Sequence, residues 1–125
     1  MAQTATKPQV QVTPAPYTPA DSGKAMFDAY CASCHGLDAK GHGPAAPALK
    51  SPVPDLTTLA KAHGGQYPAF VVTETLRVTK PIPAHGSSEM PVWGPIFSQV
   101  SRHDQAVIQQ RIHNLNTYIE SLQQK

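Results

Sequence analysis

Two cysteines and a histidine fall within five consecutive residues, Cys31-Ala32-Ser33-Cys34-His35, and no other feature constrains the chain as strongly. The sequence contains only these two cysteines. A disulfide across two intervening residues closes a small, strained ring that is more typical of redox enzymes than of secreted scaffolds. The cluster therefore indicates a reactive or cofactor-binding segment.

The spacing of this cluster predicts a covalently attached haem. Two thiols with two residues between them can each add to one haem vinyl group, which places the next residue under the iron. We expect haem c bound through Cys31 and Cys34, with His35 as the proximal ligand. A structural zinc site needs four ligands and usually two paired knuckles, and a thioredoxin-like dithiol needs a βαβ setting. Neither context is evident in the sequence, and both remain alternatives.

The sixth position of the iron is expected to be filled by Met90. Methionine often closes haem iron in electron carriers, where it raises the reduction potential. Met90 lies in a loop rich in proline and glycine, far enough along the chain to reach the opposite face of the ring. Met1 belongs to the N-terminal tail, and Met26 is expected to be a core side chain of the first helix.

The histidines are the rivals of Met90 for the iron. His85 shares its loop and is the main alternative ligand. The others are expected to be solvated or to cap helices: His42, His63, His103 and His113.

The length of 125 residues fits one domain, and a small domain needs extra stabilisation that an apolar haem would supply. Four prolines and no helical period mark residues 1–20 as an extended tail, either a leader remnant or a tether to a membrane anchor or another domain. We expect residues 21–125 to form a monohaem domain.

The charge of the chain argues against nucleic acid as a partner and otherwise says little about its partners. The net charge is +2 and no run of Lys or Arg forms a basic stripe. The sequence has neither a membrane span nor the charged and apolar regions of a signal peptide. We expect a mature form whose leader has been removed, located in the bacterial periplasm, where haem attachment of this type follows export.

The pattern predicts an all-α fold of about four helices packed around one haem, with no convincing strand pair. The expected helices are about 22–32, from 54–55 to 64–65, 68–78, and about 107–122; β-branched residues leave a strand as the alternative for the third. Residues 36–55 and 81–95 are expected to be loops. Asp21 or Ser22 should cap the first helix, and Ser101 or Asp104 the last.

The first helix resembles that of the class I cytochromes c, particularly small bacterial monohaem forms. Gly23, Phe27 and Cys31 repeat the family's spacing of glycine, aromatic residue and cysteine. The resemblance covers about residues 21–123 and implies that the first helix crosses the last one closely. The partners in that crossing would be Leu115, Tyr118 and Ile119.

Two further segments are similar to loops of that family. The run from His35-Gly36 to Gly43-Pro44 implies that the Pro44 carbonyl accepts a hydrogen bond from the proximal histidine, with Pro47 as the second candidate. The segment from Met90 to Gly94, sequence MPVWG, is similar to the family's methionine loop. Trp93 would then lie near the haem edge or a propionate, or simply pack in the core.

The resemblance implies one-electron transfer rather than enzymatic catalysis. Redox partner proteins, such as a membrane oxidase or reductase, would dock over the haem edge on small, weak interfaces. That face could include Ala32, Pro44, Ala45, Ala46 and Pro47. The protein is expected to be a monomer. The alternatives are a haem-c subunit or domain of a larger oxidoreductase, and a peroxidase or gas sensor with a labile sixth ligand.

Overall fold

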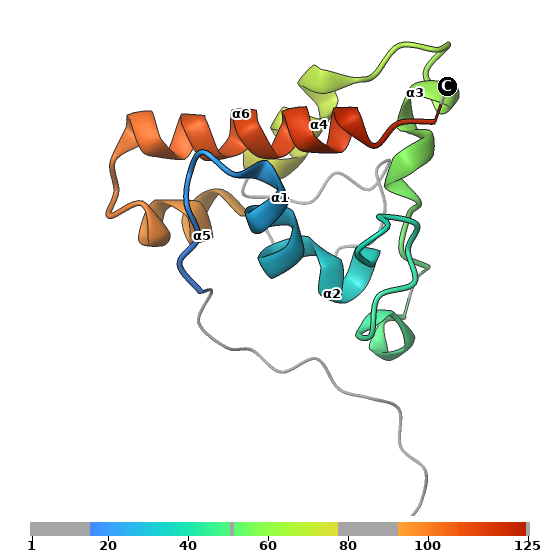
Figure 1. Cartoon of the computed structure of the whole chain (residues 1–125), viewed down its shortest axis with the longest axis horizontal. Coiled ribbons are helices and arrows are strands. Elements are labelled where there is room, and N and C mark those ends of the chain that lie inside the picture. The colour runs from blue at the N-terminus through green and yellow to red at the C-terminus, as the bar shows by residue number, and fades with distance from the viewer. Residues whose placement is uncertain (1–15, 51, 78–92, 125) are drawn as a thin grey trace, which may run out of the picture.

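The computed structural model describes residues 16–50, 52–77 and 93–124, and all regular structure among them is helical (Figure 1). The prediction of an all-α fold is thereby confirmed. In chain order the elements are α1 (Gly23–Met26), a π-helical turn (Phe27–Cys31), α2 (Ala32–His35), a 3₁₀ turn (Ala46–Ala48), a second 3₁₀ turn (Leu56–Thr58), α3 (Leu59–Ala62), α4 (Ala69–Arg77), α5 (Trp93–Val100) and α6 (Gln105–Ser121).

The first three elements form one continuous helical segment, the attachment helix, residues 23–35. Ser22 is its N-cap, because its hydroxyl accepts a hydrogen bond from the backbone N–H of Ala25 at 3.1 Å. This confirms one of the two predicted caps. The segment continues three residues beyond the expected end at Ala32, so that both cysteines and His35 are helical.

The predicted last helix is confirmed as α6. Asp104 is its cap, because one carboxylate oxygen accepts from the N–H groups of Ala106 and Val107 at 3.0 and 3.3 Å. Apolar residues at steps of three and four face the interior and are at least nine-tenths buried: Ile108, Ile112, Leu115 and Ile119. The other candidate cap, Ser101, is instead buried beside α6.

α1 and α6 cross closely, as the family resemblance implied (Figure 1). A side chain at Gly23 would collide with the backbone carbonyl of Asn114 and with Cβ of Tyr118. One turn further on, the rings of Phe27 and Tyr118 lie 5.5 Å apart. A residue without a side chain is thus needed where the helix axes approach.

The two middle helices also form where the sequence predicts them. Asp55 caps the 3₁₀ turn that leads into α3, by accepting from Thr57 N at 2.8 Å. α3 ends at Ala62, just before Gly64 and Gly65. α4 confirms a helix rather than a strand for the third predicted element.

α5 was not predicted, and the expected loop 81–95 is wrong at its C-terminal end. α5 begins at Trp93 and includes Pro95 in its first turn, where the missing N–H has no intrahelical partner to lose. Trp93 and Phe97 are buried, so burial of aromatic side chains favours the helix. Residues 81–92 lie outside the described residues.

The part of the chain that packs against the helices begins before residue 21, where the domain was expected to start. Residues 16–20, here called the N-terminal strap, lie against α6 and the attachment helix. Tyr30 donates its hydroxyl hydrogen to the carbonyl of Pro16 at 2.6 Å, and Asn114 donates to the carbonyl of Ala20 at 2.9 Å. Thr18 is buried between these two contacts.

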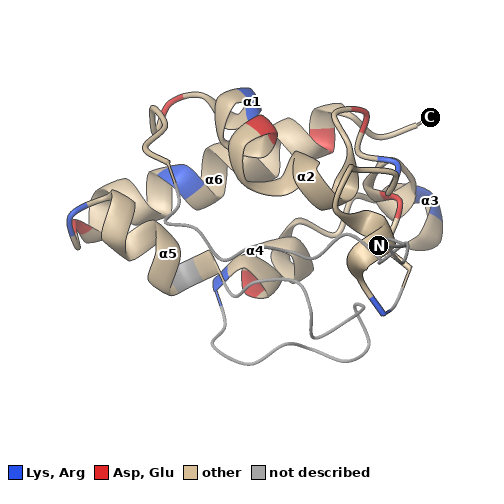
Figure 2. Cartoon of the chain, turned by 90° about the horizontal axis from the view of Figure 1, so that it is seen from below, with Lys and Arg blue, Asp and Glu red and all other residues tan. Residues whose placement is uncertain are grey.

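Charged residues are scattered singly along the described elements, with no block of one sign (Figure 2). Of the helices in the described ranges, none combines the length and the apolar character that crossing a membrane would require.

Candidate haem-binding site

The two cysteines lie at the C-terminal end of the attachment helix, just after a change in helical pitch. The N–H of Ala32 bonds to the carbonyl of Phe27, five residues back, which makes residues 27–31 a π-helical turn. Such turns occur frequently at functional sites. Cys31 and Cys34 form no disulfide with each other. They are three positions apart and therefore lie on neighbouring parts of one helix face.

The state of Cys31 argues against a redox dithiol. Burial, with a smaller contribution from the nearby Cys34, raises the pKa of the Cys31 thiol to about 12. Reactive dithiol motifs instead lower the pKa of a cysteine so that the thiolate forms near neutral pH.

The zinc alternative also lacks support in the described residues. Nowhere in residues 16–50, 52–77 and 93–124 do three His, Cys, Asp or Glu side chains gather closely enough to hold a metal ion. A closed structural zinc site needs four such ligands.

His35 is buried and oriented by a backbone carbonyl. Its Nδ1 lies 3.2 Å from the carbonyl oxygen of Pro54. Because a carbonyl can only accept, Nδ1 carries the hydrogen and Nε2 keeps its lone pair for a metal. Burial lowers the pKa of His35, and the bond to Pro54 opposes this less strongly. The imidazole is therefore neutral at neutral pH, as a metal ligand must be.

The acceptor for His35 is Pro54, so the assignment of this role to Pro44, or to Pro47, is wrong. Both of those prolines are solvent-exposed. The backbone N–H of Leu56 donates to the carbonyl of Ala39 at 2.7 Å, which holds the chain around Pro54 beside the attachment helix. Because His35 and Pro54 are 19 residues apart, the residue spacing around His35 could not predict this hydrogen bond.

The loop that follows His35 turns back and bonds to the end of the attachment helix. The N–H groups of Gly41, Gly43 and Ala45 donate to the carbonyls of His35, Cys34 and Ser33 at 2.7, 3.0 and 2.7 Å. These carbonyls have no partner within the helix, so the loop supplies one for each.

Gly43 makes this return possible. A side chain there would collide with the backbone carbonyls of Ala32 and Ser33. The resemblance drew attention to Gly43 because of the proline that follows it, whereas the structure shows that the glycine itself is required.

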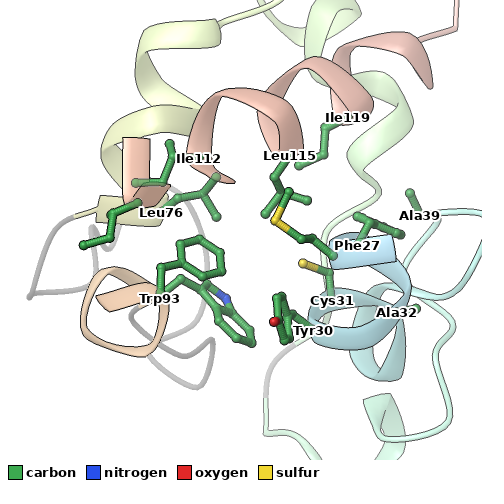
Figure 3. Close-up of a cluster of buried hydrophobic side chains, with 13 residues drawn as sticks. Phe27, Tyr30, Cys31, Ala32, Ala39, Leu76, Trp93, Ile112, Leu115 and Ile119 are labelled. Carbon is green, nitrogen blue, oxygen red and sulfur yellow. The ribbon is translucent and has the colours of Figure 1, made fainter. Parts of the chain in front are cut away.

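Aromatic and aliphatic side chains from α4, α5 and α6 face the attachment helix (Figure 3). The ring of Tyr30 lies 5.4 Å from that of Trp93 and 5.8 Å from that of Phe97. Leu76 of α4 and Leu115 of α6 belong to the same buried cluster. Sequence reasoning missed Phe97, because it lies in the helix that the prolines concealed.

These residues fit a covalently bound haem. They provide two cysteines one helical turn apart and an imidazole whose Nε2 can bind a metal. They also provide buried apolar side chains that a flat apolar ring could pack against. Cys31, Trp93 and Leu115 lie around one shared interior, on three different elements (Figure 3). Trp93 is buried in this cluster, in agreement with core packing; its relation to a haem edge stays a prediction.

The remaining candidate ligands divide into two groups. Met90 and its alternative His85 lie outside the described residues. The other histidines are exposed, as expected: His42, His63, His103 and His113. His63 Nδ1 lies 2.8 Å from the carbonyl of Leu59 at the end of α3, and His103 Nδ1 lies 2.7 Å from the hydroxyl of Ser98.

An all-α domain with a pair of cysteines outside any disulfide, an oriented histidine and an apolar interior has the features of a c-type haem protein. A comparison with protein families agrees: the family model for cytochrome c matches residues 20–123. The chain belongs to the cytochrome c family. Comparisons with curated proteins and with solved structures gave no match.

Family membership determines the cofactor and the general chemistry. The cofactor is haem c, attached covalently through Cys31 and Cys34. The chemistry is haem-based electron transfer, since members of this family are generally electron carriers.

Proposed function

We propose that the protein carries single electrons with a haem iron held by His35 and Met90, and that it serves redox partners in the periplasm or at its membrane. The hydrogen bond from His35 Nδ1 to the Pro54 carbonyl is the observation that carries this proposal. It fixes the tautomer that leaves Nε2 free, and it restrains the ring at the end of the helix that bears both cysteines.

The bound haem supplies an iron that changes between two oxidation states by one electron. The chain holds it in two ways. Cys31 and Cys34 fix the ring covalently, and His35 presents Nε2 from the same helix. Met90 would be the second protein ligand of the iron, and two protein ligands would leave no position vacant for a substrate.

Residues beside the attachment site provide the proposed docking face. Pro44 and Pro47 are exposed and Ala45 and Ala46 are half-buried, which supports their assignment to this face. Ala32 is buried and does not belong to it. Leu37, two residues after His35, is 70% exposed and adds an apolar side chain there. Small interfaces of this kind are typical of transient redox encounters.

The test is an absorption spectrum of the purified holoprotein, oxidised and then reduced. The expected result is the reduced spectrum of a c-type haem, with the weak long-wavelength band of a sulfur–ferric-iron bond in the oxidised form. Met90→Ala should remove that band, lower the potential and allow exogenous ligands to bind. The matched variant His85→Ala should leave all three unchanged.

Two results would contradict the ligand assignment. An unchanged spectrum and potential in Met90→Ala would exclude Met90 as the sixth ligand. An unchanged ligand field in His35→Ala would exclude His35 as the proximal one. Rapid binding of cyanide by the wild-type ferric protein at neutral pH would favour a peroxidase or gas sensor with a labile sixth ligand.

A further inference from the structure

The largest fully buried side chain in the described part of the molecule belongs to a cation, Arg111 of α6. It is 1% exposed. A guanidinium keeps its charge in proteins, and burying a charge is costly unless the charge is paired and hydrogen-bonded. The position of Arg111 therefore needs an explanation.

The partners of Arg111 are neutral. Its Nε donates to the Ser101 hydroxyl at 2.9 Å, and its Nη1 donates to the Thr18 hydroxyl at 3.0 Å. Its guanidinium carbon lies 5.3 Å from the centre of the Tyr17 ring. Within the described ranges, the ion pairs join Lys24 to Asp28 and Arg77 to Glu74, and neither includes Arg111. Among the described residues, no buried side-chain polar atom lacks a hydrogen-bond partner, and no acidic side chain pairs with Arg111.

The hydroxyl groups beside Arg111 are oriented by their neighbours. Tyr30 has one hydroxyl hydrogen and donates it to the Pro16 carbonyl at 2.6 Å. The 2.8 Å contact between the hydroxyls of Thr18 and Tyr30 must then be donated by Thr18. Arg111 thus donates to Thr18, Thr18 donates to Tyr30, and Tyr30 donates to Pro16. Because the three hydrogen bonds run in one direction, each strengthens the next.

This series connects the cation with the residue beside a haem attachment cysteine. Tyr30 immediately precedes Cys31, and its ring contacts the buried rings of Trp93 and Phe97. Arg111 is thus two hydrogen bonds away from the residue next to an attachment cysteine. Tyr17 and Thr18, which help to enclose the cation, precede the region matched by the family model, which begins at residue 20.

We propose that Arg111 is a fixed, buried cation that raises the reduction potential of the haem, and that the N-terminal strap keeps it dry. This inference rests on the proposed electron-transfer function. The oxidised iron carries one more positive charge than the reduced iron. A nearby cation in a medium of low dielectric constant therefore stabilises the reduced form relative to the oxidised form.

The first test is a spectroelectrochemical titration of the full-length holoprotein at high salt. Arg111→Gln removes the charge and should shift the midpoint potential to a lower value. Arg111→Lys keeps the charge but loses the planar fork that reaches both hydroxyls, and it should shift the potential much less. Arg102→Gln removes an exposed cation, which salt screens, and it should leave the potential unchanged.

A second pair of variants tests the charge while Arg111 stays in place. Thr18→Asp gives the guanidinium a carboxylate partner and should lower the potential. Thr18→Asn is the neutral control of similar shape and should keep the potential close to that of the wild type. This pair remains informative if Arg111→Gln does not fold.

Three results would overturn the inference: equal potentials in Arg111→Gln and the wild type, an equal fall in Arg111→Lys and Arg111→Gln, or equal potentials in Thr18→Asp and Thr18→Asn. In each case a reversible one-electron couple in the wild type would leave the proposed function standing. A wild-type protein with no such couple would overturn the proposed function and this inference together.

Discussion

The two ends of the attachment helix are held by different forces. At its N-terminal end, Gly23 and Phe27 pack against α6, and the contact depends on shape and apolar burial. At its C-terminal end, backbone N–H groups of Gly41, Gly43 and Ala45 bond to carbonyls of the helix. Side chains therefore secure the end far from His35, and the main chain secures the end that carries it.

Because of this difference, the stability of the fold and the orientation of His35 depend on different residues. The apolar crossing contributes free energy of folding through buried area, which is large but has little directional preference. Hydrogen bonds contribute less in net free energy but fix direction. Changes at the crossing should mainly alter the free energy of unfolding, and changes at the loop should mainly alter the environment of His35.

The largest expected effect is at the centre of the crossing. Phe27 is fully buried, and Phe27→Ala should lower the free energy of unfolding by about 3–5 kcal/mol, because it removes buried apolar area and leaves a cavity. Denaturant titration of the holoprotein measures this loss. Phe70 is 77% exposed, so Phe70→Ala should change stability by less than about 0.5 kcal/mol. Equal losses in the two variants would show that the crossing does not stabilise the fold.

A smaller loss is expected from Gly23→Ala, at about 1–3 kcal/mol, because the added methyl group meets the backbone of α6, which cannot move aside. The same substitution in an exposed helix would instead stabilise by about 1 kcal/mol. A lower free energy of unfolding in Gly23→Ala would therefore show that α1 and α6 approach closely at Gly23, and a higher one would show that they do not.

The neighbouring Lys24→Ala serves as the control for that change. Lys24 is exposed and pairs with Asp28 at 2.6 Å. Its loss should leave the free energy of unfolding close to that of the wild type, as is usual for an exposed pair four residues apart. A stabilised Gly23→Ala protein would contradict the crossing as described.

At the other end, Gly43→Ala should cost about 1 kcal/mol, near the lower limit for overpacking, because a loop can shift where packed helices cannot. The shift would weaken the bonds to Cys34 and Ser33, and with them the orientation of His35. Absorption and potential measurements should therefore change more in Gly43→Ala than in Gly23→Ala. The reverse order would contradict the division between the two ends.

The same division explains what the sequence could predict. The crossing uses residues at helical spacing, such as Gly23, Phe27 and the apolar stripe of α6, and periodicity within one element reveals these. The caps Ser22 and Asp104 were also predictable, because caps act over two or three residues. The attachment motif itself is a local pattern of five residues.

Contacts between distant segments could not be predicted in this way. Pro54 accepts from His35 across 19 residues, and only the folded loop brings the two together. Arg111 follows two glutamines of α6 and precedes Ile112, and an arginine in such a sequence is usually exposed. Its burial depends on Thr18, which is 93 residues away. α5 was concealed because Pro95 is a breaker in the interior of a helix but not in its first turn.

The smallest expected effect is at Asp55, the N-cap that follows Pro54, whose carbonyl accepts the hydrogen bond from His35. Asp55→Ala should lower the free energy of unfolding by about 0.5–1 kcal/mol, at the lower end for an N-cap because the turn that it caps is short. Asp55→Asn keeps a capping oxygen and should lose less. Hydrogen bonding from the Thr57 hydroxyl is the main cause that lowers the pKa of Asp55, opposed in part by burial and assisted by the Thr57 N–H, Lys40 and His42.

The sign of the pH dependence follows from that direction. A carboxyl group whose pKa is lower in the folded state stabilises the protein above its unfolded pKa of about 4, and this contribution disappears as the pH falls through the folded value. The difference in stability between the wild type and Asp55→Asn should thus be constant near neutral pH and should shrink below about pH 4. If it grew in acid, Asp55 would not act as a charged cap. Because Asp55 directly follows Pro54, its loss should also disturb the absorption spectrum of the haem, and more than a substitution at the α1–α6 crossing does at equal stability.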